Sequence, residues 1–263
     1  MRPLWAALAA TLLLAIPANA ADAHAVLAAP RQRVETADFR ASGHLVRVDA
    51  SGARTSYGIT IKAHWFPGVL RALVEVAPPQ SDRTKPGPDA RAHILLEMRP
   101  NGQNTILIAR PGDKAPAALP FDKWSDGPLG NGFSYEDFLE QQYFWPDQAL
   151  LEETRFGARD CDVVKSTPGA ADNSHYSEVK SWLDHDNRFP VYVEKTLKGG
   201  TVKEFTSFGL RQEGGVWSAH QVEAKIRGHA GSTLLIIDRG TPHANLSLKE
   251  FSPAQMMHFQ DRK

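Results

Sequence analysis

The stretch YSEVKSWLDHDNRFPVYVEKTLKGGTVKEF, residues 176–205, predicts three β-strands joined by two turns. Apolar and aromatic residues lie on both sides of the polar run DHDN, residues 184–187. Asp and Asn favour turns because their side chains hydrogen-bond the local backbone and tolerate left-handed conformations. The glycine pair at 199–200 marks the second turn. The stretch therefore predicts consecutive antiparallel strands.

The triplet Asp184, His185 and Asp186 also allows another interpretation, a metal or catalytic site. A metal site needs three or four convergent ligands, whereas successive residues of a strand point to opposite faces. The ten histidines are scattered, and the sequence contains no HExxH pair, GxSxG elbow, phosphate loop or dinucleotide fingerprint. We therefore predict a hairpin turn here, with no catalytic residue and no metal.

Alternation of apolar and polar side chains with a period of two recurs along most of the chain. In YGITIKAHW, residues 57–65, Ile59, Ile61, Ala63 and Trp65 share one face. Further strands are predicted at 38–49, 69–77, 91–99, 103–109, 153–166, 174–184, 188–198, 201–211, 220–228 and 231–238. About ten consecutive strands joined by short turns predict a large antiparallel meander rather than alternating strand–helix units.

The first twenty residues resemble a signal peptide. Arg2 precedes the apolar run LWAALAATLLLAIP, residues 4–17, and ANA at 18–20 places small residues at a cleavage site. The run is shorter than the ~20 residues that span a membrane. We expect cleavage after Ala20, export to the periplasm, and one domain formed by residues 21–263.

Charge and cysteine content exclude other classes. Lys and Arg total 30, as do Asp and Glu, so the formal net charge is zero and nucleic acid is not an expected partner. Cys161 is the single cysteine of the chain. Because Asp160 and Asp162 flank it and oppose thiolate formation, we predict a buried structural residue rather than a nucleophile.

Two segments interrupt the strand pattern. PPQSDRTKPGPDAR, residues 78–91, predicts a Pro-rich polar loop. In GPLGNGFSYEDFLEQQYFWPDQ, residues 127–148, Ser134 and Asp137 have the spacing of a helical capping box, and Pro146 predicts the end of the helix. This helix is interpreted either as an ordinary helix packed on the sheet or as a flap over a hydrophobic concavity.

The pattern of the opening stretch resembles that of the outer-membrane lipoprotein-sorting proteins, the LolA-like superfamily, in a broader branch of it. The residues that carry the resemblance are Tyr176, Trp182, Leu183, Asp184, Phe189, Pro190, Val191, Gly199, Gly200, Val202, Lys203, Glu204 and Phe205. LGNGFSYEDFL upstream is similar to the segment before the central helix of the family, and the resemblance spans residues 38–239.

The resemblance implies a mainly β fold: a strongly curved antiparallel sheet, an incomplete and unclosed β-barrel, with a few helices plugging its concave side. It implies a periplasmic carrier that binds acyl chains of lipoproteins or other hydrophobic cargo, with no cofactor, and a protein that is not an enzyme. An inner-membrane donor and an outer-membrane acceptor would be its partners, and we expect a monomer. Two departures from the family are predicted. Pro30 interrupts the segment that forms a long amphipathic N-terminal helix in the carriers, and the Pro-rich loop at 78–91 is an addition.

Apolar residues of the C-terminal strands and of the interrupting segment form the candidate ligand-binding surface. The strands contribute Val191, Val193, Val222, Ala224 and Ile226, and the cover contributes Phe138, Leu139, Phe144 and Trp145. Two alternatives stay open. The same sheet would bind a protein partner in an envelope sensor or scaffold, and a lipid hydrolase would require a nucleophile–base pair that the sequence does not reveal.

Overall fold

The computed structural model of the protein describes residues 18–78, 91–127 and 132–259. In these residues, thirteen strands form one antiparallel sheet in the order β6-β5-β4-β3-β2-β1-β13-β12-β11-β10-β9-β8-β7. Strands that follow one another in the chain pair with one another, except β6 and β7, and β1 pairs with β13 across the middle of the sheet. The end strands β6 and β7 do not pair, so the predicted mainly β, unclosed architecture is confirmed.

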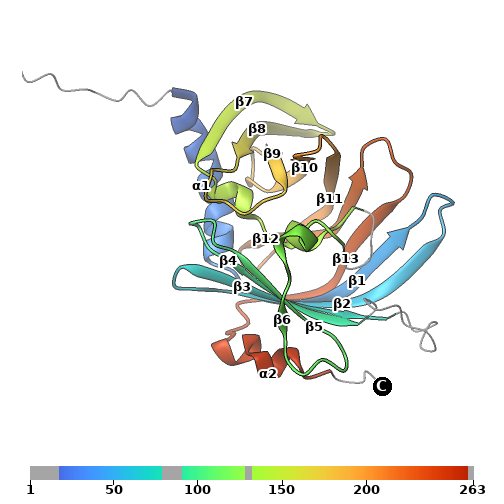
Figure 1. Ribbon diagram of the computed structural model, residues 1–263. Helices are drawn as coiled ribbons and strands as arrows, with labels where there is room; N and C mark the ends of the chain where they lie inside the picture. Colours follow the sequence, from blue (N-terminus) through green and yellow to red (C-terminus); the bar gives the residue numbers. More distant parts are fainter. Residues whose placement is uncertain (1–17, 79–90, 128–131, 260–263) are drawn as a thin grey trace, which may run out of the picture.

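The strands are β1 (Asp38–Val48), β2 (Arg54–Phe66), β3 (Val69–Ala77), β4 (Ala92–Met98), β5 (Thr105–Ala109), β6 (Ala117–Ala118), β7 (Asp147–Phe156), β8 (Arg159–Thr167), β9 (Tyr176–Asp184), β10 (Pro190–Leu197), β11 (Val202–Glu213), β12 (Val216–Ile226) and β13 (Ser232–Pro242). The helical elements are α1 (Ala18–Glu35), α2 (Pro253–Met256) and the 3₁₀ turns η2 (Phe121–Lys123), η3 (Tyr135–Phe138), η4 (Gln141–Phe144) and η5 (Leu248–Phe251). Figure 1 shows that the sheet curves around the segment between β6 and β7.

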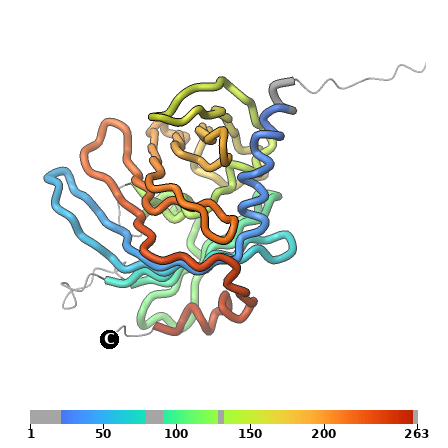
Figure 2. Tube along the Cα trace, turned by 180° about the vertical axis from the view of Figure 1, so that it is seen from behind, coloured from blue at the N-terminus to red at the C-terminus, as the bar shows by residue number. Residues whose placement is uncertain are grey.

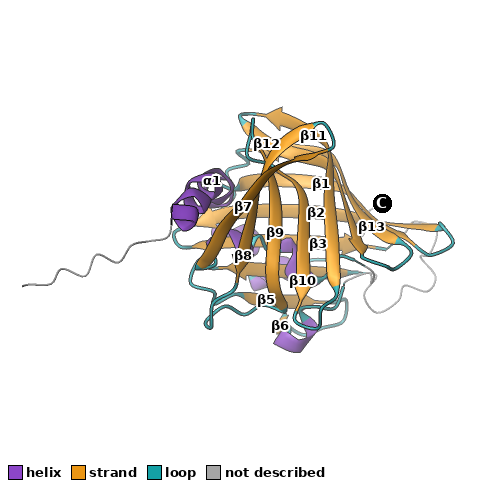
Figure 3. Ribbon diagram, turned by 90° about the horizontal axis from the view of Figure 1, so that it is seen from above, coloured by secondary structure: helices purple, strands orange, loops and turns teal. Residues whose placement is uncertain are grey.

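The core lies on the concave side of the sheet. Side chains of β2 to β5 pack there against α1 and against Trp124, Tyr135, Leu139 and Tyr143 from the segment between β6 and β7. Seen from above, short helical turns lie inside the curve of the strands and α1 lies beside β7 (Figure 3). The position of these turns matches the implied helices on the concave side.

The outer face of β3 to β5 is covered by the C-terminal segment. Leu246, Phe251 and Met256 pack with Leu73 and Leu95 in a separate buried cluster. Figure 2 shows this C-terminal segment beneath the sheet, with α1 running along one side. These strands are therefore buried on both faces, which explains why β4 contains the nearly continuous apolar run AHILLEM.

The expectation that Pro30 interrupts the N-terminal helix is wrong. The helix runs for 18 residues and includes Pro30 in its interior. Ala23, Leu27, Pro30 and Val34 are all buried, and their spacing places them on one face of the helix. Packing of this face on the sheet offsets the helical hydrogen bond that proline cannot donate. Within the described residues, no helix is long and apolar enough to cross a membrane.

Two other predictions need correction. The single strand predicted at 153–166 is a hairpin, with β7 and β8 joined at Gly157, whose φ of 61° is left-handed. The helix predicted after Ser134 consists of η3 and η4, two separate 3₁₀ turns, although its predicted Ser134–Asp137 capping box is present. Residues 79–90 of the Pro-rich loop and residues 1–17 of the predicted signal peptide lie outside the described residues.

Candidate functional site

Residues 133–145, named here the plug segment, contribute aromatic side chains to the concave face. Phe133 and Trp145 form a buried cluster with Tyr176, Val179, Val193, Phe205 and Ala224 of the strands. The rings of Phe133 and Phe205 meet edge-on at a centroid distance of 5.4 Å. The plug segment thus covers an apolar surface that β9 to β12 present to the interior.

Most of the nine predicted site residues meet in this region. Trp145, Val193 and Ala224 belong to the buried cluster, and Phe138 and Val222 pack against it. Leu139 lies in the neighbouring core cluster, against which Phe138 and Phe144 pack. The strand residues were expected to form one surface, but β11 separates β10 from β12 and contributes Phe205 between them.

Val191 and Ile226 do not belong to either cluster. Val191 is buried. Ile226 lines an open pocket of about 90 Å³ together with Gly132, Ala224 and residues 229–232. Because ligand sites usually enclose roughly 300–1,000 Å³, this pocket is too small for an acyl chain. The concave face is occupied by the plug segment in this structure.

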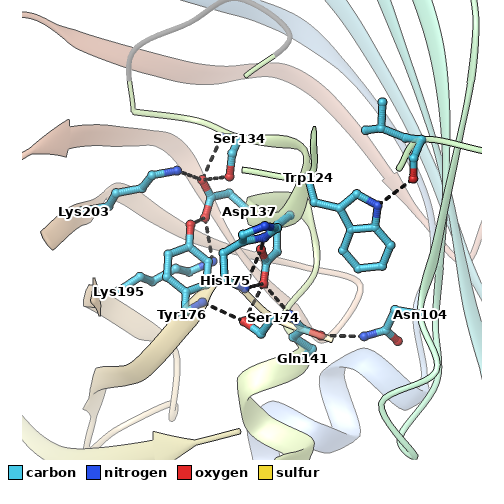
Figure 4. Close-up of polar contacts among 12 residues, drawn as sticks. Asn104, Trp124, Ser134, Asp137, Gln141, Ser174, His175, Tyr176, Lys195 and Lys203 are labelled. Atoms are coloured by element: carbon cyan, nitrogen blue, oxygen red, sulfur yellow. Dashed lines mark hydrogen bonds and ion pairs between the residues drawn. The ribbon is translucent and has the colours of Figure 1, made fainter. Parts of the chain in front are cut away.

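The plug segment is held by a buried carboxylate that the sequence pattern identified only as part of a capping box. Asp137 accepts hydrogen bonds from Ser134 N at 2.8 Å, Ser134 Oγ at 2.7 Å and Tyr176 Oη at 2.6 Å. Its two oxygens each lie 3.1 Å from an ammonium nitrogen, that of Lys195 or that of Lys203 (Figure 4). All three charged side chains are almost fully buried, with exposures of 0%, 7% and 6%.

The electrostatic environment keeps Asp137 ionised. Burial alone would raise the pKa of this carboxyl, but the positive charges of Lys203 and Lys195 and the hydrogen bond from Tyr176 outweigh it, so the pKa lies well below its usual range. Burial and the neighbouring Asp137 charge raise the pKa of Tyr176 well above its usual value. Tyr176 therefore stays protonated and donates to the carboxylate.

The two lysines are directly opposite each other on neighbouring strands, where like charges repel. Lys195 is an even number of residues from Val191 and Val193 on β10, and Lys203 is two residues from Phe205 on β11. Residues with this spacing share one face of a strand, so both lysines project to the apolar face. On the other face of the same hairpin, Glu194 pairs with Glu204 in register. Alternation could have placed these lysines on the apolar face, but it could not have identified Asp137 as their partner.

A second carboxylate joins the plug segment to the start of β9. Glu136 accepts hydrogen bonds from Ser174 Oγ at 2.5 Å and from Gln141 Nε2 at 2.9 Å, and its Oε2 lies 3.0 Å from His175 Nδ1. Figure 4 shows Ser174 and Gln141 gathered at this carboxylate, with Asn104 donating to Gln141 at 2.5 Å. Two adjacent carboxylates of η3 thus have different partners. Glu136 binds the residues just before β9, and Asp137 binds side chains of β9, β10 and β11.

α1 contacts the other end of the plug segment. Arg31 Nε donates to the carbonyl oxygen of Tyr143 at 2.6 Å, and Arg33 forms an ion pair with Glu140 at 2.8 Å. The plug segment is therefore bound by polar contacts to the sheet and to α1 and by the packing of its aromatic side chains.

The DHDN run forms the predicted hairpin turn between β9 and β10. Asp186 N donates to Asp184 Oδ1 at 2.8 Å, Arg188 N donates to Asp184 O at 2.8 Å, and Arg188 has a left-handed φ of 56°. Asp184 is buried and forms an ion pair with Arg159. Local turn chemistry therefore accounts for this run.

The folded strands bring Glu153 and Asp162 close to His185, which the prediction of one strand over 153–166 did not anticipate. Potential ligand atoms of these three residues lie within 4.8 Å of one another. Arg188 pairs with Asp162, and His185 Nε2 lies 3.2 Å from the same carboxyl group. The guanidinium supplies a positive charge at this position, so we interpret the group as an ion-pair cluster beside the turn.

Cys161 is fully buried, as predicted. Burial, together with the charge of Asp184, raises the pKa of its thiol. These conditions favour the neutral thiol over the reactive thiolate.

Known structures share this architecture. An outer membrane lipoprotein-sorting protein domain from Vibrio parahaemolyticus aligns with a TM-score of 0.80 at 19% identity, over 91% of this chain and 100% of that one. A DUF1329 family protein from Desulfovibrio piger gives 0.75 at 14% identity, over 90% and 99%. A LolA superfamily protein from Nitrosomonas europaea gives 0.63 at 14% identity, over 89% and 98%. The fold is LolA-like.

Sequence comparison adds the family. A protein-family model described as "Uncharacterized protein" matches residues 113–258, more than half of the chain, and the chain belongs to that family. This match includes the plug segment, both buried lysines and the C-terminal segment. No curated protein matches the sequence.

Proposed function

We propose that the protein is a periplasmic carrier that binds acyl chains of lipoproteins or of other hydrophobic cargo on its concave face. The observation that carries the proposal is the apolar, aromatic surface of β9 to β12, which is covered by the plug segment rather than by another sheet. The cargo would occupy this surface when the plug segment moves away. The likeness to a lipoprotein-sorting protein domain supports this proposal.

The energetics of acyl-chain burial suit a carrier. Each buried methylene contributes about 0.8 kcal/mol, so one long chain contributes on the order of 10 kcal/mol before the costs of association. Displacing the plug segment removes packing and ion pairs, and this cost lowers the net affinity. A cargo would thus be bound firmly enough for transit yet released to an acceptor that binds it more tightly. In this proposal an inner-membrane protein donates the cargo, an outer-membrane protein accepts it, and no catalytic step occurs.

A charge at Ile226 tests the proposal. Ile226 is partly exposed and lines the open pocket, so a carboxylate in Ile226→Glu would reach water and the fold should survive. We expect a cooperative thermal unfolding transition and loss of most binding of a fluorescent fatty-acid probe. Val216→Glu is the matched control, because Val216 is an exposed apolar residue of the same strand. It should bind the probe as the wild type does.

Further measurements distinguish the carrier from the alternative, an envelope sensor or scaffold that binds a protein partner. If folded Ile226→Glu and Phe138→Ala, Trp145→Ala and Val222→Ala variants all bind the probe normally, the carrier proposal is wrong. Mass spectrometry of organic extracts from protein purified out of its native periplasm should recover lipid at near-stoichiometric amounts. A stoichiometric protein complex that persists without lipid would instead support the sensor or scaffold.

A further inference from the structure

Two buried ammonium groups within an apolar surface are unexpected for a site that binds hydrocarbon alone. Lys195 Nζ lies 5.0 Å from the ring centroid of Phe205 and 5.3 Å from that of Tyr176, and Lys203 Nζ lies 5.7 Å from the latter ring. Lysine is rarely buried this far, and burial of an ion is costly unless it is paired. Acyl chains would gain nothing from either charge.

The counter-charge of these lysines belongs to the plug segment and not to the sheet. Lys195 and Lys203 are on β10 and β11, whereas Asp137 is on η3. If the plug segment leaves the concave face, Asp137 leaves with it. Both ammonium groups then face the exposed apolar surface, where another anion would restore their pairing.

We propose that Lys195 and Lys203 form a subsite for the anionic head group of the cargo, a carboxylate or a phosphate, which takes the place of the Asp137 carboxylate. This inference rests on the proposed function, since the apolar chain of the same molecule would lie on the carrier surface. Asp137 shows the required geometry: two ammonium groups each 3.1 Å from a different oxygen, and a tyrosine hydroxyl donating at 2.6 Å. Carboxylate and phosphate both present oxygens in this arrangement.

An unpaired donor in the same cluster provides a second observation. Trp145 belongs to the same buried cluster as Tyr176 and Phe205, and its indole Nε1–H has no hydrogen-bond acceptor among the described residues. Buried donors normally have a partner. A head group with more oxygens than a single carboxylate would offer it one.

Two probes with the same acyl chain but different head groups separate the contribution of the head-group charge to binding from that of apolar contact. The probes are a pyrene-labelled long-chain fatty acid and its methyl ester. The wild-type protein should bind the acid about tenfold more tightly or better, because the ester leaves two ammonium groups unpaired in an apolar site. Inorganic phosphate alone, added as a competitor, should not displace the acid.

The decisive variant replaces the whole charged group by neutral side chains of similar size: Asp137→Asn, Lys195→Met and Lys203→Met together. Such replacements of buried ion pairs are often neutral or stabilising, so this triple variant should fold. It should bind the acid and the ester equally. The matched control neutralises the charged group on the other face of this hairpin, with Glu194→Gln and Glu204→Gln, together with Arg227→Met at the residue after β12 that pairs with both. It should keep the preference for the acid.

The outcomes separate this inference from the proposed function. Equal binding of acid and ester by the wild type, or an unchanged preference in the folded triple variant, would overturn the head-group subsite and leave the carrier standing. Displacement of the acid by phosphate alone would also overturn it, because the site would then serve a free anion. Failure of the wild type to bind either probe would overturn both.

Discussion

At the scale of single residues, the β10–β11 hairpin places like charges opposite each other on both of its faces. Inside, Lys195 and Lys203 share the Asp137 carboxylate, and outside, Glu194 and Glu204 share the Arg227 guanidinium. The inner group is almost fully buried, whereas the side chain of Arg227 is 49% exposed. Water and salt screen the outer group, so we expect the two groups to differ in their contributions to stability.

The first prediction compares these groups. Asp137→Asn leaves two buried ammonium groups without a counter-charge, and we expect the free energy of unfolding to fall by about 3–5 kcal/mol. Arg227→Met, the exposed counterpart, should lower it by about 1 kcal/mol or less. Urea unfolding measures both values. Equal losses in the two variants would show that the buried ion pairs of Asp137 contribute no more to the free energy of unfolding than the exposed ion pairs of Arg227.

The second prediction concerns pH. The pKa of Asp137 in the folded protein lies below its ordinary value of 3.8, so its contribution to stability is complete above that value and declines as the pH falls toward the folded pKa. The difference in unfolding free energy between wild type and Asp137→Asn should therefore shrink between pH 5 and pH 3. Urea unfolding at both pH values tests this, and a difference that grows on acidification would contradict the assignment.

The third prediction concerns the turn after β9. His185 contacts Asp162, which also pairs with Arg188, so His185→Ala should change the unfolding free energy by about 1 kcal/mol or less. Addition of Zn²⁺ to the wild type should leave the melting temperature unchanged. A rise in melting temperature with Zn²⁺ that disappears in His185→Ala would instead make Glu153, Asp162 and His185 a metal site.

At the scale of elements, the pairing of β1 with β13 joins the two parts of the sheet. Its register shifts between Ser42 and Gly43. A Cβ atom placed on Gly43 would lie 1.9 Å from the carbonyl oxygen of Ile236, which is far inside van der Waals contact. A residue without a side chain is therefore required at this irregularity.

The fourth prediction tests this requirement. Gly43→Ala forces the backbone of β1 away from β13, and we expect a loss of about 1–3 kcal/mol in unfolding free energy or failure to fold. Gly240→Ala is the control on the same strand pair, because no atom lies within 4 Å of its added Cβ. It should change stability by about 0.5 kcal/mol or less. Thermal unfolding measures the stability of both variants. Equal stabilities would show that the carbonyl oxygen of Ile236 does not exclude a side chain at position 43.

At the scale of the whole molecule, distant parts of the chain meet on the concave side. α1 from the N-terminus binds the plug segment through Arg31 and Arg33, and the plug segment binds β9 to β11 through Glu136 and Asp137. The interior of the curved sheet is therefore filled by the protein itself. Under the proposed function, cargo binding requires these contacts to open, so lipid affinity and the stability of the plug segment are coupled.

The fifth prediction concerns the mature protein. Ala23, Leu27 and Val34, the buried residues that attach α1 to the core, all follow the predicted cleavage site after Ala20. Cleavage there should leave this packing intact. N-terminal sequencing of protein recovered from the periplasmic fraction should identify Ala21 as the first residue. Protein that retains residues 4–17 in the membrane fraction would contradict this expectation.

The sequence by itself determined most of the strands, most of their turns and the class of fold, but it did not predict β6 (Ala117–Ala118) or the first part of β7 (Asp147–Phe156). Alternation of side chains and turn-forming residues act over a few neighbouring positions, so the DHDN turn and the Ser134–Asp137 capping box were predictable. Local patterns were weaker where packing decided the conformation. Pro30 lies inside α1 because the buried face of that helix packs on the sheet, and a lone Gly157 turns the strand predicted at 153–166 into a hairpin.

Only the tertiary structure decided which charges meet on the concave face. Asp137 is 58 residues from Lys195 and 66 from Lys203 in the chain. Their contact depends on the curvature of the sheet, on the register of β10 with β11 and on the path of the plug segment. None of these is encoded in the few residues around any one of the three side chains, because long-range pairing is the sum of many packing interactions along the sheet.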